Sequence, residues 1–220
     1  MTAVIFDLDG TLVDSAPAIC AVVNTLLAEL SVPPLTLEDS KGYMGYGAPR
    51  FLDQALASRG IGRSEVQFAE HLRRFLVLYE AAPPDANPPF PAVQQVLDQL
   101  VAKGVRLGLC TNKPTAPTYA ILRALAWDRL FSAIVTGDTL PQRKPSAEPV
   151  LETARRLGSA INFYVGDSEV DAEAARAARL PFILHERGYR RQSIEEMRPQ
   201  ASFTHYEQLP KILASFAAAA

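Results

Sequence analysis

Short, mostly apolar runs that end abruptly at polar residues recur along the chain. They occupy residues 3–6, 105–110, 133–135, 163–165 and 181–184. A continuous apolar run of this length is typical of a strand that is buried on both faces, as in a parallel sheet. The pattern therefore predicts five strands of a mainly parallel sheet.

Segments with apolar residues at helical spacing lie between these runs. In residues 93–103 the apolar positions recur every three or four residues, and segments 118–125, 149–157 and 172–178 share this pattern. Strands that alternate with helices are typical of α/β proteins. The chain is therefore predicted to have an α/β fold with a Rossmann-like parallel sheet core.

Residues 16–82 break this alternation, because one helical pattern follows another. Three amphipathic stretches cover residues 19–30, 51–56 and 66–79, and Ser64 is a suitable N-cap for the third. The Pro-rich segment 83–91 cannot lie inside a helix and is predicted to return the chain to the core. We therefore predict an α/β core of residues 1–15 and 83–220, with an inserted helical cap of residues 16–82.

The composition indicates a soluble globular protein, with 48% hydrophobic and 21% charged residues among 220. The net charge of -2 argues against a general nucleic-acid-binding surface. The chain has no apolar stretch of membrane-spanning length, and its start does not resemble a signal peptide. Cys20 and Cys110 do not suggest a disulfide framework. We expect a cytoplasmic protein without nucleic-acid or membrane partners, and a frayed end at residues 217–220.

Polar residues follow the predicted strands, at the edge where open parallel sheets bind ligands. In chain order they are Asp7, Asp9, Thr111, Asn112, Lys144, Asp167 and Asp171. Carboxylate oxygens suit Mg²⁺, and a lysine is a good partner for a phosphoryl group. The sequence therefore predicts a site for a hard cation and a phosphate.

The segment Asp7-Leu8-Asp9-Gly10-Thr11 is the most specific motif. Its two carboxylates can reach one pocket, and Gly10 permits a tight turn. One carboxylate can attack phosphorus while the other serves as general acid and base. A calcium loop of the EF-hand type fits poorly, because its glycine comes later and a glutamate ends it.

The other motif residues have ordinary explanations when each is taken alone. Thr111 and Asn112 would be turn residues, Lys144 a solvated surface lysine, and Asp171 an acid placed near a helix N-terminus. Only their ordered combination along the chain favours a functional site.

That combination resembles the haloacid dehalogenase superfamily of phosphohydrolases. The match covers four motifs in order: residues 7–11, 111–112, 144–145 and 166–171. The helical insert resembles the small α-helical cap class, and residues 137–145 and 188–190 resemble bacterial phosphoglycolate phosphatases. The chain departs from the usual pattern at three backbone-shaping positions, Ala92, Ala147 and Arg179.

The resemblance implies a role for each motif residue. Asp7 would be the nucleophile and Asp9 the general acid and base, with Thr111 and Lys144 completing the catalytic set. Gly10, Thr11 and Asn112 would bind the substrate. The ligands of Mg²⁺ would be Asp7, the backbone carbonyl of Asp9 and Asp167, with Asp171 supporting the cation directly or through water.

The implied activity is Mg²⁺-dependent hydrolysis of a small phosphorylated metabolite through a phospho-aspartate, with 2-phosphoglycolate as the leading substrate. Alternatives are a sugar-phosphate mutase or sugar-phosphate phosphatase of the same superfamily, or a non-catalytic binding protein on this fold. Dehalogenases of the superfamily lack the second aspartate, so Asp9 argues against that activity. We expect a monomer or a homodimer.

The helical insert is expected to close over the core, with hinges near residues 14–17 and 82–91. Its segment 41–50 would then face the substrate, and Arg50 would pair with the carboxylate of 2-phosphoglycolate. Alternatively, Arg50 is a solvated residue at a helix start. His71, His185 and His205 match no motif and are expected at the surface or in packing.

Overall fold

The strands of the computed structural model, which describes residues 2–62, 64–159 and 161–218, form one six-stranded parallel sheet with the order β3-β2-β1-β4-β5-β6. They are β1 (Thr2–Phe6), β2 (Arg106–Cys110), β3 (Ala133–Val135), β4 (Ile161–Gly166), β5 (Phe182–His185) and β6 (Ala201–Phe203). The predicted apolar runs became β1 to β5, whereas β6 was not predicted. The α/β fold class with a parallel sheet core is confirmed.

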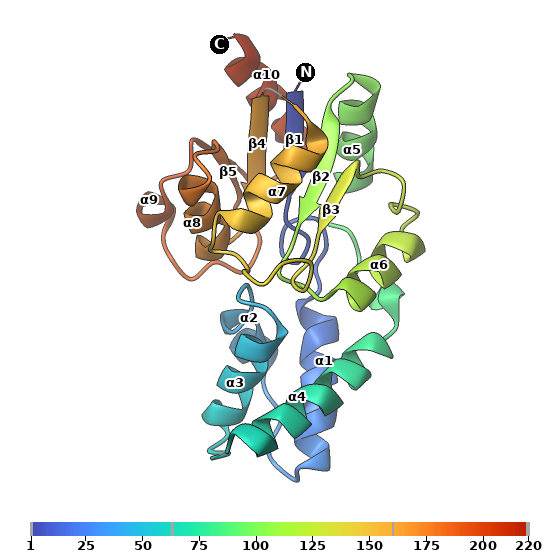
Figure 1. The fold of residues 1–220 in the computed structure, drawn as a ribbon, viewed down its shortest axis with the longest axis vertical. Coiled ribbons are helices and arrows are strands. Elements are labelled where there is room, and N and C mark those ends of the chain that lie inside the picture. Colours follow the sequence, from blue (N-terminus) through green and yellow to red (C-terminus); the bar gives the residue numbers. More distant parts are fainter. Residues whose placement is uncertain (1, 63, 160, 219–220) are drawn as a thin grey trace.

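Helices cover both faces of this sheet (Figure 1). They are α5 (Val93–Ala102), α6 (Thr115–Ala124), α7 (Glu148–Leu157), α8 (Glu169–Ala177), α9 (Ile194–Met197), the 3-10 turn η2 (Tyr206–Gln208) and α10 (Leu209–Ala218). Val4 and Phe6 of β1 pack in one apolar cluster with α5 and α10, and Ala3 and Ile5 pack in another with α7 and α8. Alternate residues of β1 are therefore buried on opposite faces of the sheet.

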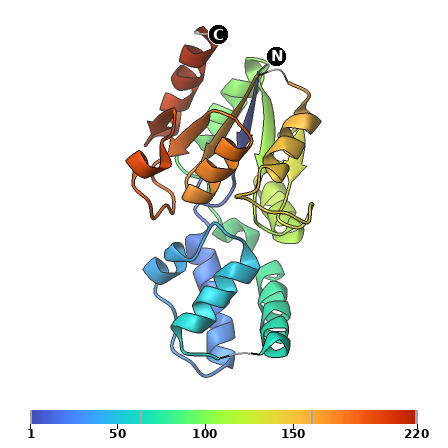
Figure 2. The ribbon, with the colours of Figure 1, turned by 60° about the vertical axis from the view of Figure 1, so that its left-hand side comes forward.

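The inserted segment forms α1 (Ala16–Glu29), α2 (Leu37–Gly42), α3 (Ala48–Ser58) and α4 (Glu65–Glu80), followed by the 3-10 turn η1 (Pro84–Ala86). Helices α1, α3 and α4 share an apolar cluster of their own, to which the core adds Tyr189. Ser64 caps α4 as predicted, because its hydroxyl accepts a hydrogen bond from the Gln67 backbone N–H. Figures 1 and 2 show the helices gathered beyond the carboxyl ends of the strands.

Two short segments connect the helical insert to the core, and they lie side by side. The Asp14 N–H donates to the Pro88 carbonyl at 2.9 Å, and the Phe90 N–H donates to the Leu12 carbonyl at 3.0 Å. Both crossings therefore occur at one place beside the end of β1. The division into a core of residues 1–15 and 83–220 and a cap of residues 16–82 stays a prediction.

Several element boundaries differ from the predicted ones. Segment 41–50 is not one loop, because α2 ends at Gly42 and α3 begins at Ala48. Helices α6 and α8 each begin three residues before the predicted start. Residues 217–218 continue α10 rather than fraying, while residues 219–220 lie outside the described residues.

Two of the three departures from the family pattern occupy left-handed backbone. The φ angles are 63° at Ala92 and 57° at Arg179. Left-handed conformation strains a residue that carries a Cβ, which explains why glycine is usual at both positions. Ala147 has an ordinary helical backbone. Among the described residues, no helix combines the length and apolarity that a membrane crossing requires.

Candidate active site

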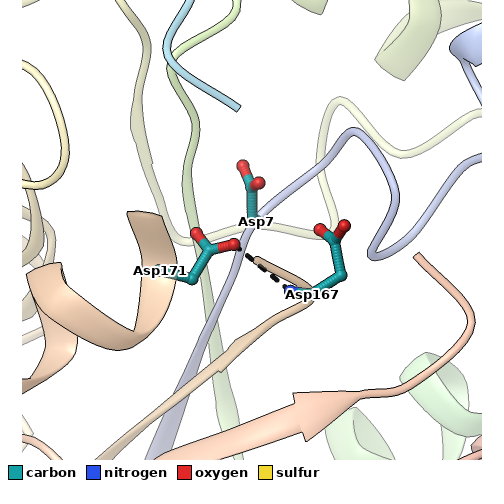
Figure 3. Close-up of side chains that lie close together, drawn as sticks. All are labelled: Asp7, Asp167 and Asp171. Carbon is teal, nitrogen blue, oxygen red and sulfur yellow. Dashed lines mark hydrogen bonds between the residues drawn. The ribbon is translucent and has the colours of Figure 1, made fainter. Parts of the chain in front are cut away.

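Three carboxylates meet at the carboxyl edge of the sheet, where β1 and β4 lie next to each other (Figure 3). Asp7 follows β1, Asp167 follows β4, and Asp171 lies in the first turn of α8. Each offers one oxygen within 4.8 Å of the others. The chain runs from β1 to β2 and β3 on one side and to β4 and β5 on the other. This is a topological switch point, where open α/β sheets bind ligands.

Asp171 is held by hydrogen bonds on both carboxylate oxygens. Oδ2 accepts from the Asp167 N–H at 3.2 Å, from the Ser168 N–H at 3.1 Å and from the Ser168 hydroxyl at 2.6 Å. Oδ1 accepts from Lys144 Nζ at 2.7 Å and from the Tyr164 hydroxyl at 3.1 Å. Since these donors occupy its oxygens, Asp171 is suited to orient its neighbours more than to bind a cation itself.

The Lys144 ammonium lies beneath Asp7. Its Nζ is 3.0 Å from Asp7 Oδ1, 2.7 Å from Asp171 Oδ1 and 2.8 Å from the Tyr164 hydroxyl oxygen. Burial alone would lower the pKa of Lys144, but the charges of Asp171 and Asp7 raise it above its ordinary value. Lys144 is therefore a fixed positive charge that partly balances the carboxylates.

The remaining negative charge fits a divalent cation. Burial raises the pKa of Asp7 to about 7, with contributions from Asp171 and Asp9, and burial also raises the pKa of Asp167. Asp7 is buried, and the one partner of its carboxylate among the described residues is Lys144, with Nζ 3.0 Å from Oδ1. Oxygen ligands of this kind suit Mg²⁺. Asp7 and Asp167 are the carboxylates best placed to hold it.

Close contacts from residues 10–11 and 188–189 position the Asp167 carboxylate. The Thr11 hydroxyl donates to its Oδ1 at 2.8 Å, and the Tyr189 N–H donates to its Oδ2 at 2.7 Å. A Cβ at Gly10 would lie 2.3 Å from Asp167 Oδ2, and one at Gly188 would lie 2.2 Å from it. Gly10 and Thr11 were predicted to bind substrate. In the structure they lie against Asp167. Neither is among the residues that line the cavity described below.

The loop after β2 brings Thr111 and Asn112 to the site. Thr111 is buried and lines the cavity. The Asn112 amide donates to the Lys144 carbonyl and the Gly45 carbonyl, both at 2.9 Å, and its Oδ1 accepts from the Lys144 N–H at 3.0 Å. The Asn112 side chain thus ties the Lys144 loop to the helical insert. It was predicted to hold phosphoryl oxygens.

Asp9 is paired with a lysine that sequence reasoning missed. Lys113 Nζ lies 3.0 Å from Asp9 Oδ1 and also donates to the Tyr79 hydroxyl of α4. Asp9 lies outside the group of three carboxylates. The available signal was position, since Lys113 directly follows Thr111 and Asn112 at the end of a strand.

A cavity of about 580 Å³ of empty space, partly open to solvent, lies between the sheet edge and the insert. Asp7, Asp9 and Asp167 line its floor, and apolar residues of the insert such as Phe51 and Phe75 line the opposite wall. Arg50 does not line it. Its side chain is 61% exposed and lies 3.5 Å from Asp53, so the structure does not bring Arg50 to this site.

The histidines stay outside the cavity, but His185 has more than a packing role. It is buried, and its Nδ1 lies 2.9 Å from the Gly10 carbonyl, to which it must donate. Burial lowers the pKa of His185, which keeps its ring neutral. His185 therefore supports the turn at Gly10 from below, a contact that the sequence did not indicate.

Gly137 lies against the loop that carries Thr111 and Asn112, and we expect Gly137→Ala to damage the site. The added Cβ would lie 2.1 Å from the Asn112 carbonyl oxygen, so this loop must move. A displacement near 1 Å can lower activity about 10²-fold, and overpacking lowers stability by about 1–3 kcal/mol. Phosphate release and thermal unfolding measure the two effects.

Gly42→Ala is the matched control for this substitution. A Cβ at Gly42 would meet no described atom of another segment within 4 Å, so activity should change little. Wild-type activity in Gly137→Ala would show that the loop after β2 tolerates displacement.

Known proteins share both the sequence and the fold of this chain. The family model for haloacid dehalogenase-like hydrolases matches residues 4–185. A phosphoglycolate phosphatase of Cereibacter sphaeroides (strain ATCC 17029 / ATH 2.4.9) is 44% identical over 213 residues, which cover 97% of this chain and 98% of the relative. One of Rhodobacter capsulatus is 36% identical, with 96% of each chain covered.

Among solved structures, a crystal structure of a predicted phosphoglycolate phosphatase from Haemophilus somnus 129pt superposes with a TM-score of 0.87. The sequence identity is 29%, and the match covers 96% of this chain and 97% of that one. The similarity includes the helical insert as well as the sheet, since almost the whole chain is covered.

Proposed function

Because the chain belongs to the haloacid dehalogenase-like hydrolase family, we propose that it hydrolyses 2-phosphoglycolate with Mg²⁺ and a phospho-aspartate intermediate on Asp7. It is an enzyme, a phosphoric monoester hydrolase. The substrate, the cation and the intermediate are the proposal. A small phosphorylated metabolite would thus be its partner. A cytoplasmic location and a monomeric or homodimeric state remain predictions.

One observation carries the proposal. The Asp7 carboxylate is buried at the floor of the cavity with Lys144 Nζ 3.0 Å from its Oδ1, and Asp9 lines the same cavity. A carboxylate whose one side-chain partner among the described residues is an ammonium keeps lone pairs available to attack phosphorus. We infer that Asp9, the second carboxylate of the motif lining the cavity, protonates the leaving group.

In the first step a carboxylate oxygen of Asp7 forms a bond to phosphorus, and the bond from phosphorus to the ester oxygen breaks. Asp9 gives its proton to the departing oxygen, which leaves as the hydroxyl of glycolate. In the second step Asp9 takes a proton from water, whose oxygen attacks the phosphorus of the phospho-aspartate. Inorganic phosphate leaves, and the Asp7 carboxylate is restored.

The surrounding residues hold the phosphoryl group while this happens. Lys144 supplies a positive charge beside Asp7, and Thr111 lines the cavity. Asp7 and Asp167 would hold Mg²⁺, which when bound would offset the negative charge of the phosphoryl oxygens. The apolar residues of the insert would limit the access of water.

The test is a screen of phosphorylated metabolites with 2-phosphoglycolate, sugar phosphates, nucleotides and pyrophosphate, each with and without Mg²⁺. The proposal expects release of inorganic phosphate and the highest kcat/KM for 2-phosphoglycolate. Transfer of the phosphoryl group to a second position of a sugar would identify a mutase instead. Absence of turnover on every compound would favour a non-catalytic binding protein.

A further inference from the structure

Lys113 is a buried cation that the mechanism above does not use. Its side chain is 0% exposed, whereas that of its partner Asp9 is 17% exposed and faces the cavity. Its ammonium has two recorded partners, Asp9 Oδ1 at 3.0 Å and the Tyr79 hydroxyl. A buried ammonium needs a negative partner, because an unpaired charge in such a place is strongly disfavoured.

Lys113 is also the only basic residue among the described residues that line the cavity. Lys144 lies below the floor, engaged with Asp7 and Asp171, and Arg50 points to solvent. The wall contributed by the insert is mostly apolar. A negative group on the non-phosphate part of a substrate would therefore find one cation in the cavity, and that cation stands beside Asp9.

We propose that Lys113 selects the substrate by exchanging Asp9 for the carboxylate of a short phosphorylated 2-hydroxy acid. This inference rests on the phosphatase function proposed above. It identifies Lys113 as the residue that recognises the non-phosphate part of the substrate. To protonate the ester oxygen, Asp9 must first take up a proton from solvent, and a protonated Asp9 no longer balances the charge of Lys113. A substrate carboxylate that enters at the same place becomes the new partner of the ammonium.

The geometry fits a short substrate. In a phosphorylated 2-hydroxy acid, one carbon separates the ester oxygen from the carboxyl group. Asp9 is 3.0 Å from Lys113, so the group that protonates the ester oxygen and the group that binds the carboxylate are adjacent. A neutral substrate gives Lys113 no replacement for Asp9, and Asp9 then stays bound to the ammonium.

The test compares 2-phosphoglycolate with its amide, phosphoglycolamide, which has nearly the same shape but a neutral NH₂ group in place of a carboxylate oxygen. Lys113→Met removes the charge and keeps a chain of similar length. We expect kcat/KM for 2-phosphoglycolate to fall about 10- to 100-fold, as for the loss of one charged hydrogen bond. The value for the amide should not fall by a comparable factor, because Lys113 has no carboxylate to bind there, so the preference for the carboxylate collapses.

Lys103→Met is the matched control, because Lys103 is an exposed lysine at the end of α5. It should leave the preference as it is in the wild type. Equal losses on both esters in Lys113→Met would overturn the proposal and leave Lys113 as a structural partner of Asp9. If Lys113→Met does not fold, the ratio of the kcat/KM values of the two esters in the wild type is the test. A preference of tenfold or more for the carboxylate supports the proposal. The absence of a preference overturns it.

Binding separates this inference from the proposed function. In Asp7→Asn protein, which should not turn over, calorimetry gives the Kd of both esters with and without Lys113→Met. A preference for the carboxylate that vanishes with Lys113 supports the inference even if the wild type hydrolyses neither ester. A Kd ratio that Lys113→Met leaves unchanged overturns it, whatever the activity of the wild type.

Discussion

Asp7→Asn is expected to abolish phosphate release while the protein stays folded. An amide cannot form the bond to phosphorus, and loss of a nucleophile typically lowers kcat on the order of 10⁴-fold or more. The substitution keeps the shape of the side chain. Without a cation it should not lower the melting temperature, because it removes a carboxylate whose pKa burial raises to about 7.

Phosphate release from 2-phosphoglycolate and from an aryl phosphate measures the effect, with thermal unfolding as the check on folding. Asp128→Asn makes the same chemical change on the exposed surface and should behave like the wild type. Turnover of a folded Asp7→Asn protein above contamination level would rule out Asp7 as the nucleophile.

Asp9→Asn distinguishes the roles of the two aspartates. Loss of a general acid and base lowers the rate about 10²- to 10⁴-fold, and the phosphoenzyme should then persist because water lacks a base. Acid quenching with labelled substrate should trap phosphate on Asp9→Asn protein and none on Asp7→Asn protein. The same experiment tests the covalent intermediate directly.

The elements that position the site could be predicted because each one has a local signature. Asp7 and Asp167 directly follow apolar runs that became β1 and β4, so their meeting at one edge follows from a parallel sheet. Helix α4 was predicted from the helical spacing of its apolar residues and from Ser64 as its N-cap. In contrast, β6 has the sequence Ala-Ser-Phe, in which a serine interrupts the apolar run, and the six residues of α2 are too few for a helical period to be recognised.

The contacts between side chains could not be predicted, because they join segments that are far apart in the sequence. Thr11 and Asp167 are separated by 156 positions, and Lys113 and Tyr79 by 34. The motifs identify which residues reach the edge of the sheet, but not which neighbour each one meets there. For Arg50 the structure agrees with the alternative prediction, because this residue lies in the first turn of α3 with its side chain 61% exposed.

Removal of the divalent cation is the second change with a large expected effect. In excess EDTA we expect phosphate release to fall by about 10³-fold or more, since electrostatic stabilisation of this size is typical of one strong active-site contact. Added Mg²⁺ should restore it. The physical reason is the crowding of Asp7, Asp167 and Asp171 around one point, which Lys144 alone cannot balance.

The cation should also stabilise the fold. A ligand that binds only the folded state at about 100 times its Kd raises the free energy of unfolding by about 2.7 kcal/mol. The melting temperature should therefore rise with Mg²⁺ in the wild type and much less in Asp167→Asn protein. Asp128→Asn again serves as the surface control, with the full rise expected.

Calcium provides the sharpest form of this prediction. Ca²⁺ binds carboxylates with more ligands and looser geometry than Mg²⁺, so it should raise the melting temperature while it inhibits turnover. A cation that only neutralised the charge of Asp7 and Asp167 would support activity whatever its identity. Equal activity with both cations would therefore reduce the role of the metal to charge balance, and full activity in excess EDTA would remove the metal from the mechanism.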